Sequence, residues 1–421
     1  MAALRPRPVR YFVYVAIGLA AAALLYFVYL VWGGGVALSD RTMLWRMLRD
    51  QGIEAPSEDL VSRQLRVPAG YRVTRWAADL PSARMMTMTA TGELIVAQPR
   101  GGLVSLLARD ADGDGRSDGR TVLFTGLDRP NGVDLHEGWL YIAESTRISR
   151  VRFDALTGRP TGALMPVVEG LGGDGNHWRK TARIGPDGRL YVGSGSTCNV
   201  CLEEDRQRAT IWVYAADGTG GGEYATGLRN PTGFDWAPWD GALYAAENGR
   251  DLLGDDLPPD ELNRIEQGVF YGWPYVHGDG LPDPEFGRGT AAGDGEGVAS
   301  RVAAARKPVH AFRAHNAPLG MRFLRHPVHA PDHDRVALVA LHGSWNRSVP
   351  DGYAVVALHW HADGRIEERP FLSGFRREAG LIGRPVDVVE SAEGEIYVSD
   401  DYAGVVYRIT RSTPPIPVAA R

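Results

Sequence analysis

A short strand pattern recurs six times along this chain, and it restricts the possible folds more than any other feature. Each copy consists of a turn followed by an apolar strand that ends in a small residue. The copies occupy residues 92–97, 138–143, 188–193, 241–246, 336–340 and 394–399. Regular repetition of one such unit is typical of architectures that stack or circle a single supersecondary element.

The spacing of the copies indicates what each unit contains. The first four begin about 46 to 53 residues apart, which is enough for four short strands joined by turns. The 52 Gly and 27 Pro residues suit so many turns. A Gly/Pro/Asp-rich insertion at residues 250–310 accounts for the gap of about 95 residues between the fourth and fifth copies. The sequence therefore predicts an all-β, six-bladed β-propeller of four-stranded antiparallel blades.

The two ends of the repeat region favour a closed ring. The last strand ends near Thr410, and residues 71–77 near the start could pair with it and complete the sixth blade. An open array and two packed sandwiches are the alternatives, and neither needs this pairing.

A hydrophobic segment precedes the repeats. Residues 11–32 are 22 consecutive uncharged, mostly apolar positions, long enough to cross a hydrocarbon core of ~30 Å as a helix. Arg5, Arg7 and Arg10 precede it, so the positive-inside rule predicts a single-pass inner (cytoplasmic) membrane protein with its propeller in the periplasm. A cleaved signal peptide is the alternative, with a weak cleavage site in the glycine-rich stretch that follows.

These features divide the chain into five parts. They are a cytoplasmic N-terminus (1–10), a transmembrane signal anchor (11–32), a linker with a short helix near 41–50 (33–66), the propeller (67–411) and a C-terminal tail (412–421). The formal net charge is −5, and no long basic run follows the N-terminus. No nucleic-acid partner is therefore expected.

Four segments within the repeats combine chemically active residue types. They are residues 175–180, 227–233, 247–263 and 383–388. They supply a histidine, guanidinium groups, amides, and carboxylates near a glycine whose carbonyl is accessible. Loops at one face of a propeller converge on the central channel, so these scattered segments are expected to meet there. The combination suits an anionic cofactor together with a hard cation.

The order and spacing of these segments resemble the glucose/sorbosone dehydrogenase family, the soluble-type aldose sugar dehydrogenases that depend on pyrroloquinoline quinone (PQQ). The resemblance covers about residues 68–411 and is strongest at 177–191, 227–233 and 260–263. It implies a six-bladed propeller that holds PQQ and Ca²⁺ over the channel. It also implies oxidation of an aldose-type sugar at C1 to a lactone or acid, with a quinone or cytochrome as electron acceptor.

The resemblance also implies individual residue roles. His177 matches the catalytic base and Arg229 the residue beside the quinone oxygens. The implied cofactor contacts are Asn230, Asn248, Arg384, Arg347 and His315. The implied substrate contacts are Asn131 and Asn176, and the implied metal ligands are Gly249 and Arg250, through their carbonyls, and Glu261 at a second, structural Ca²⁺.

Several positions depart from the family pattern. Ser196 stands where an Asp orients the base, and Val386 replaces a second basic residue. A lysine after the fifth repeat is absent, and His342 and Arg347 are the candidates to replace it. The alternative functions are a Ca²⁺-dependent propeller lactonase or hydrolase and a non-enzymatic binding propeller. The histidine, arginine and asparagine set with Arg384 favours an anionic cofactor over both.

Two local motifs complete the sequence. Residues 110–118 carry carboxylates at calcium-loop positions 1, 3, 5 and 9 but have Thr121 at position 12, so a Ca²⁺ site is an open alternative to a solvated turn. Cys198 and Cys201 are the two cysteines of the chain. No His follows them, which excludes covalent haem attachment, and a local disulfide is expected in an oxidising compartment.

Overall fold

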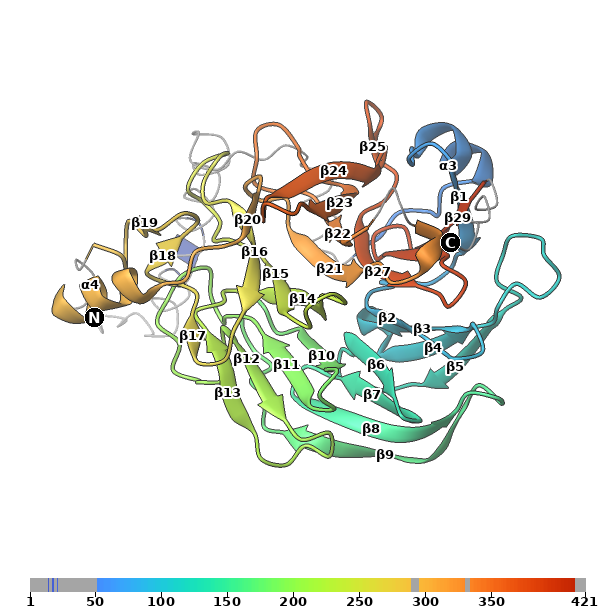
Figure 1. The fold of residues 1–421 in the computed structure, drawn as a ribbon, viewed down its shortest axis with the longest axis horizontal. Coiled ribbons are helices and arrows are strands. Elements are labelled where there is room, and N and C mark those ends of the chain that lie inside the picture. The colour runs from blue at the N-terminus through green and yellow to red at the C-terminus, as the bar shows by residue number, and fades with distance from the viewer. Residues whose placement is uncertain are drawn as a thin grey trace, which may run out of the picture.

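Six β-sheets surround a central channel in the computed structural model (Figure 1). The structure describes residues 14, 17, 18, 21, 51–288, 295–329 and 334–412. The innermost strand of each sheet faces the channel. These strands are β2 (Met86–Met88), β6 (Gly132–His136), β10 (Lys180–Ile184), β14 (Pro231–Trp236), β21 (Pro318–Phe323) and β27 (Pro385–Glu390). The predicted all-β, six-bladed propeller is confirmed.

Each repeated segment of the sequence forms the second strand of a blade. These strands are β3 (Leu94–Gln98), β7 (Trp139–Ala143), β11 (Leu190–Ser194), β15 (Leu243–Glu247), β22 (Val336–Leu341) and β28 (Ile396–Asp400). Nearly all of their residues are buried, because both faces pack against neighbouring blades. This two-sided burial explains why the segments are continuously apolar rather than alternating.

The outer strands are more exposed and complete the blades. They are β4 (Leu103–Leu107), β5 (Arg120–Phe124), β8 (Arg147–Asp154), β9 (Arg159–Glu169), β12 (Thr210–Tyr214), β13 (Gly222–Thr226), β16 (Asp260–Ile265), β20 (His310–Phe312), β23 (Ala354–Trp360), β24 (Ile366–Leu372) and β29 (Val405–Arg411). Two 3₁₀ turns, η1 (Pro99–Gly101) and η2 (Pro327–His329), and a small hairpin of β25 (Arg376–Arg377) and β26 (Gly380–Leu381) lie in the connections.

The first strand of the propeller completes the last blade. Strand β1 (Tyr71–Ala77) pairs antiparallel with β29, with Tyr71 opposite Arg411. Trp76 is 1% exposed and packs edge-on against Tyr397, with ring centroids 4.8 Å apart. Helix α3 (Glu58–Gln64), capped by Ser57, buries Val61 against the same blade. The ring is therefore closed, as the sequence suggested.

The long insertion in the fourth blade extends to its neighbour. Strand β17 (Val269–Phe270) pairs parallel with β13 and adds a fifth strand to the third blade. A hairpin of β18 (Val276–His277) and β19 (Leu281–Pro282) and helix α4 (Gly295–Ala304) project beyond it (Figure 1). The third blade therefore has five strands instead of the expected four.

Three aspartates, of which Asp235 and Asp387 are buried and Asp134 is half-buried, connect alternate pairs of blades at the channel. Asp134 accepts a hydrogen bond from the backbone of the third blade at Ile184 N (2.8 Å). Asp235 and Asp387 do the same for the fifth and first blades, at Phe323 N (2.9 Å) and Met86 N (2.8 Å). These bonds add directional contacts to the apolar packing between sheets.

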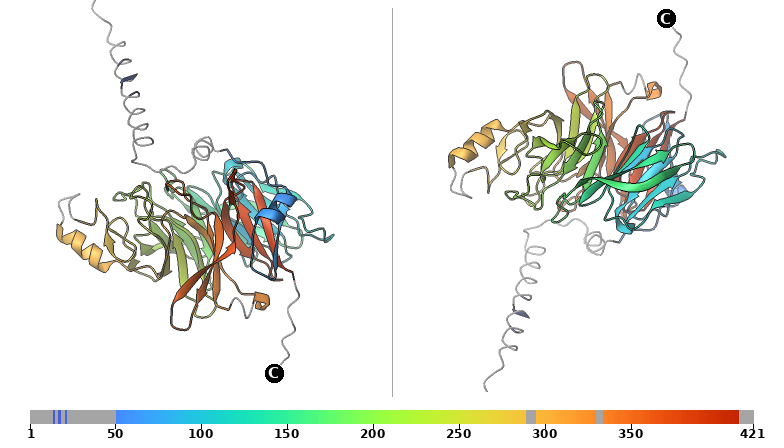
Figure 2. Two further views of the ribbon diagram at one scale, coloured as in Figure 1. Left: turned by 90° about the horizontal axis from the view of Figure 1, so that it is seen from above. Right: turned by 90° about the horizontal axis from the view of Figure 1, so that it is seen from below.

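The predicted single-pass inner-membrane location requires correction. In the part of the chain that the structure describes, no helix is long and apolar enough to cross a membrane. Helices α3 and α4 have 7 and 10 residues, which at ~1.5 Å per residue cover half or less of a ~30 Å hydrocarbon core. The predicted span 11–32, apart from residues 14, 17, 18 and 21, and the predicted helix near 41–50 lie outside the described residues. Figure 2 shows the two described helices at the rim of the propeller.

Candidate active site

A cavity of about 390 Å³ lies at one end of the channel, between loops of all six blades. Seven of the residues singled out in the sequence line it, namely Asn131, Asn176, His177, Asn230, Asn248, His342 and Arg384. A larger surface groove of about 870 Å³ lies between residues 348–353 and 376–381, and none of the predicted site residues is among the described residues that line it. The channel cavity is therefore the candidate active site.

The propeller repeats the same local geometry around this cavity. Asn131, Asn230 and Arg384 each immediately precede an innermost strand, at the starts of β6, β14 and β27. His177 lies three residues before β10. Each innermost strand begins at the same end of the channel, so residues far apart in the chain share one mouth.

His177 is oriented by a neutral partner. Its Nδ1 lies 2.9 Å from Ser196 Oγ and 3.1 Å from Ser196 O. Ser196 Oγ itself donates to Cys198 O (2.7 Å), so Nδ1–H is the donor to Ser196 and Nε2 keeps its lone pair. Burial, with the positive charge of Arg229 second, holds the pKa of His177 well below its usual value. The imidazole is thus neutral at pH 7 and able to accept a proton.

Arg229 lies behind the cavity wall rather than in it. Its guanidinium donates to Asn199 O (2.9 Å), Asn199 Oδ1 (2.8 Å), Asn248 O (3.2 Å), Gly249 O (2.6 Å) and Asp251 Oδ2 (3.1 Å). The residue is 3% exposed. Its hydrogen-bonding capacity is therefore used within the protein, and its influence on His177 is through its charge.

The opposite wall contains a charged network that the sequence did not reveal. Arg84 donates to Asn131 Oδ1 (2.9 Å) and forms an ion pair with Asp401. His342 Nε2 also donates to Asp401 (2.8 Å), and burial, with Arg384 second, lowers the pKa of His342 to about 4. The position of Arg84 could have indicated its place at the cavity, because Arg84 lies just before β2 as Arg384 lies just before β27.

The charge of the lining suits an anionic ligand. Four arginines, Arg84, Arg100, Arg179 and Arg384, face one aspartate, Asp401, among the described residues of the cavity. Arg384 is held by the carbonyls of His342 (3.0 Å) and Gly343 (2.8 Å). The volume is also within the range of small-molecule sites, ~300–1,000 Å³. A tricarboxylate such as PQQ fits this environment.

Two predicted cofactor contacts lie outside the cavity lining. His315 Nε2 donates to Gly254 O (2.9 Å) and Arg347 Nη1 donates to the carbonyl of Asp255, so both side chains hold the insertion. The side chain of Arg250, a residue predicted to offer its carbonyl, pairs with Asp283 and Glu285, each at 2.8 Å. His342, at the position where a lysine was expected, lines the cavity in place of Arg347.

Glu261 belongs to a buried carboxylate pair. Glu247 and Glu261 are opposite each other on β15 and β16, and Asn263 Nδ2 donates to both, at 3.1 and 3.0 Å. Burial raises the pKa of Glu261 to about 7, and burial with repulsion from Glu261 raises that of Glu247. Asn263 Oδ1 is buried without a hydrogen-bond partner in the described structure. Two carboxylates and an unpartnered amide oxygen fit a hard cation.

The carbonyl of Gly249 does not fit a cation in the same way. It accepts a hydrogen bond from Arg229 Nη1, and the neighbouring carbonyl of Asn248 accepts one from the same nitrogen. A Ca²⁺ ion at Gly249 and Arg250 requires this positive group to move, so no step of the chemistry is assigned to a metal there.

The sequence and structure are similar to those of known proteins. A curated PQQ-dependent pyranose dehydrogenase from Coprinopsis cinerea is 26% identical over 428 residues, covering 86% of this chain and 57% of that protein. An uncharacterized protein of Borreliella burgdorferi is 29% identical over 301 residues, covering 67% of this chain and 76% of that protein. The solved holo PQQ domain of the Coprinopsis cinerea enzyme superposes with a TM-score of 0.71 at 23% identity, covering 85% and 98% of the two chains.

The family assignment rests on nearly the whole described propeller. The TrAA12-like family model matches residues 65–412, from the end of α3 to the end of β29. The resemblance to PQQ-dependent sugar dehydrogenases seen in the sequence agrees with these relatives. This chain belongs to the TrAA12-like family.

Proposed function

We propose that this protein is an oxidoreductase that oxidises a sugar with PQQ as its cofactor. The observation that carries the proposal is His177, a neutral imidazole whose Nε2 is available in a cavity lined by four arginines. The family match and the pyranose dehydrogenase relative support the same chemistry. The finer proposal is oxidation at C1 of an aldose or pyranose to a lactone or acid, with electrons passing to a quinone or cytochrome.

The chain's own residues supply position and proton transfer. When bound, PQQ supplies a two-electron acceptor for the hydrogen that leaves the sugar carbon. His177 Nε2 accepts the hydroxyl proton, while Ser196 holds Nδ1–H and so keeps the lone pair of Nε2 directed away from the loop. Asn176 lines the cavity beside His177 and is the proposed amide contact for a sugar hydroxyl. Asn131, also proposed as a substrate contact, lines the same cavity with its amide held by Arg84 and Lys180 O.

Other residues hold the anionic cofactor. Arg384 is the proposed partner for a carboxylate, and Asn230 and Asn248 line the same cavity, joined by a 2.9 Å hydrogen bond from Asn230 Nδ2. We assign Arg229 a positioning role, because its donors are used by Asn199 and residues 248–251. We place Ca²⁺ at Glu247 and Glu261, where it would neutralise facing carboxylates.

The decisive experiment adds PQQ and Ca²⁺ to the purified protein and follows cofactor binding and dye reduction with a panel of aldoses. We expect micromolar or tighter PQQ binding and sugar-dependent reduction. Absence of PQQ binding at micromolar concentration would contradict the proposal. Lactone hydrolysis without PQQ would instead support the lactonase alternative.

Arg384→Ala separates binding from turnover in the same assay. It removes a contact that is equally present before and during the reaction, so PQQ affinity should fall about tenfold or more while kcat at saturating PQQ changes little. Arg206→Ala, at a largely exposed position outside the cavity, serves as the matched control. A large loss of kcat at saturating PQQ in Arg384→Ala contradicts the assigned role.

A further inference from the structure

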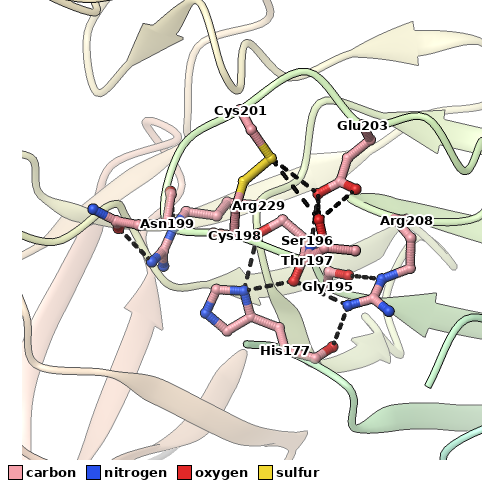
Figure 3. Close-up of a disulfide and its surroundings, with 10 residues drawn as sticks. All are labelled: His177, Gly195, Ser196, Thr197, Cys198, Asn199, Cys201, Glu203, Arg208 and Arg229. Carbon is pink, nitrogen blue, oxygen red and sulfur yellow. Dashed lines mark hydrogen bonds between the residues drawn. A yellow bond between two sulfur atoms is a disulfide. The ribbon is translucent and has the colours of Figure 1, made fainter. Parts of the chain in front are cut away.

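A disulfide-closed loop lies between the two residues expected to be catalytic. Cys198 and Cys201 are joined and enclose Asn199 and Val200, in the connection that follows the end of β11 at Ser194. Figure 3 shows this loop above His177, with Arg229 beside it. The loop contacts both residues through different atoms, although they belong to different blades.

Asn199 binds Arg229 at two points. Its carbonyl accepts from Arg229 Nε (2.9 Å) and its Oδ1 accepts from Nη2 (2.8 Å). The same Oδ1 accepts from Asp251 N (2.8 Å), and Nδ2 donates to Asp251 O (3.0 Å). One amide therefore joins the guanidinium to the segment that also supplies the carbonyls of Asn248 and Gly249.

Cys198 controls the histidine through the intervening serine. The Cys198 carbonyl accepts the Ser196 hydroxyl hydrogen (2.7 Å), which leaves the Ser196 oxygen as an acceptor for His177 Nδ1–H (2.9 Å). If this carbonyl moved, the hydroxyl could rotate and donate to Nδ1, and the proton would then sit on Nε2. The Ser196 carbonyl, 3.1 Å from Nδ1, can only accept and favours the same proton position. The carbonyls of Ser196 and Cys198 thus together favour the tautomer in which Nε2 is a base.

The base of the loop is also fixed. Glu203 accepts from Thr197 N (2.7 Å) and from Thr197 Oγ1 (2.9 Å). Buried Arg208 donates to the carbonyls of Gly195 (2.6 Å) and Ser196 (3.0 Å) on the other side. The disulfide joins the two ends of the loop. The backbone of residues 196–199, which contacts His177 and Arg229, therefore has few degrees of freedom left.

We propose that the Cys198–Cys201 loop is a shared positioning element for His177 and Arg229, with Asn199 as its positioning residue. This inference rests on the proposed function where it concerns turnover. Partners that orient a reacting group from behind affect its geometry and tautomer, and their loss costs about 10- to 100-fold in comparable sites. Cofactor and sugar binding do not depend on the loop, because none of its residues is among the described residues lining the cavity.

The kinetic test compares variants within the loop. Asn199→Ala and the double variant Cys198→Ser/Cys201→Ser should each lower kcat about 10- to 100-fold, with the PQQ Kd and the sugar KM within about twofold of the parent. Asn199→Asp retains an oxygen acceptor for Arg229 and should recover most of kcat. Val200→Ala is the control in the same loop. Substitution is used instead of a thiol reductant, because thiols react with quinones.

A second measurement does not require activity. By NMR, Arg229 Nε–H should exchange slowly with water and His177 should be in the Nδ1–H tautomer in the parent protein. In Cys198→Ser/Cys201→Ser, Arg229 Nε–H should exchange faster and His177 should show mixed tautomers. If both signals and kcat are unchanged, the positioning role is rejected. If the parent binds no PQQ, the proposed function fails while the NMR comparison still decides the inference. Asn199→Ala decides it should the double variant not fold.

Discussion

His177, the proposed base, is held by Ser196 and by no carboxylate among the hydrogen-bond partners of its ring in the described structure. Ser196 stands where the resembling family has an aspartate, and the structure shows that its hydroxyl and carbonyl both face Nδ1. A neutral partner orients the ring but adds no negative charge, so burial and Arg229 determine the pKa. The chain thus combines an oriented imidazole with a low proton affinity.

The first prediction concerns this residue. His177→Ala should retain PQQ binding and lower turnover by ~10²–10⁴, the usual contribution of a general base. His136→Ala, at the opposite mouth of the channel, should leave turnover unchanged. Full activity of His177→Ala with PQQ bound would move the base to another cavity residue, with His342 the first to test.

The pH dependence of turnover follows from the lowered pKa of His177. The pKa of His177 in the folded protein lies below 6.5, so the neutral form persists as the pH falls through 6.5, and the acid limb of kcat/KM should lie below that value. The free energy of unfolding should decrease as the pH falls below 6.5, because the unfolded chain gains a proton at this histidine that the folded chain resists. Ser196→Asp adds an anion and should move the acid limb to higher pH. An unchanged profile in Ser196→Asp contradicts this account.

At the scale of elements, the innermost strands both line the channel and join the blades. Asp235 on β14 accepts hydrogen bonds from Phe323 N on β21 (2.9 Å) and from Arg325 (2.9 and 3.0 Å). Burial by itself would raise the pKa of Asp235, but Arg183, Arg322 and Arg325 outweigh it and lower that pKa to about 2. The carboxylate therefore stabilises the junction between the fourth and fifth blades.

Asp235→Ala should weaken this junction. Removing one partner of a buried ion pair costs ~3–5 kcal/mol, and we expect the lower end because the Arg325 side chain is 43% exposed. Urea unfolding measures the loss, with Asp217→Ala in an exposed turn as control. Because the pKa is lowered, the contribution is present above about pH 3.8 and is lost as the pH falls toward 2. The parent and variant should converge there, and a constant difference contradicts the assignment.

The pairing of β15 with β16 places Glu247 directly opposite Glu261. Like charges facing each other across a ladder are unfavourable unless a cation or a proton neutralises them. Ca²⁺ should therefore raise the melting temperature, with a gain of about 2.7 kcal/mol at a hundredfold excess over Kd. Glu261→Gln should abolish the gain, whereas Asp112→Asn, in the loop of residues 110–118, should retain it. An equal gain in Glu261→Gln would place the ion elsewhere.

At the scale of the whole molecule, ring closure and the cavity depend on each other. Strand β1 closes the ring against β29, and Arg84 in the first blade pairs with Asp401 in the sixth across the same junction. Blades of a closed propeller have no free sheet edge toward their neighbours, so loss of one interface exposes two large apolar faces. Stability and cofactor affinity should therefore decline together.

Trp76→Ala tests this coupling. Trp76 is buried against Tyr397, and removing its side chain should cost ~3–5 kcal/mol. PQQ affinity should fall as well, although Trp76 is not among the described residues that line the cavity, because Arg84 and Asp401 lose their fixed separation. Arg72→Ala, on the exposed face of the same strand, is the control. Loss of stability with unchanged PQQ affinity contradicts the coupling.

The sequence by itself determined the parts of this protein that depend on local patterns. Six apolar second strands, each after a turn, predicted the six blades, and the strand at residues 71–77 predicted closure. Asn131, His177, Asn230 and Arg384 could be placed at one mouth because each lies at or just before the start of an innermost strand. Two cysteines three residues apart predicted the disulfide. Apolar periodicity and turn residues depend on short-range requirements, so the elements that they specify can be predicted from a single sequence.

Tertiary structure alone decided where long side chains point and which distant groups meet. Arg84 and Asp401 are joined because the ring closes, and nothing near either residue indicates the other. Arg229 turns toward Asn199 and Gly249, and His315 and Arg347 turn to carbonyls of the insertion, because buried guanidinium and imidazole groups need hydrogen-bond acceptors. The fifth strand of the third blade arises from the insertion of the fourth. In each case several possible partners come from segments that are distant in the sequence. The residues around each side chain therefore do not indicate which partner it binds.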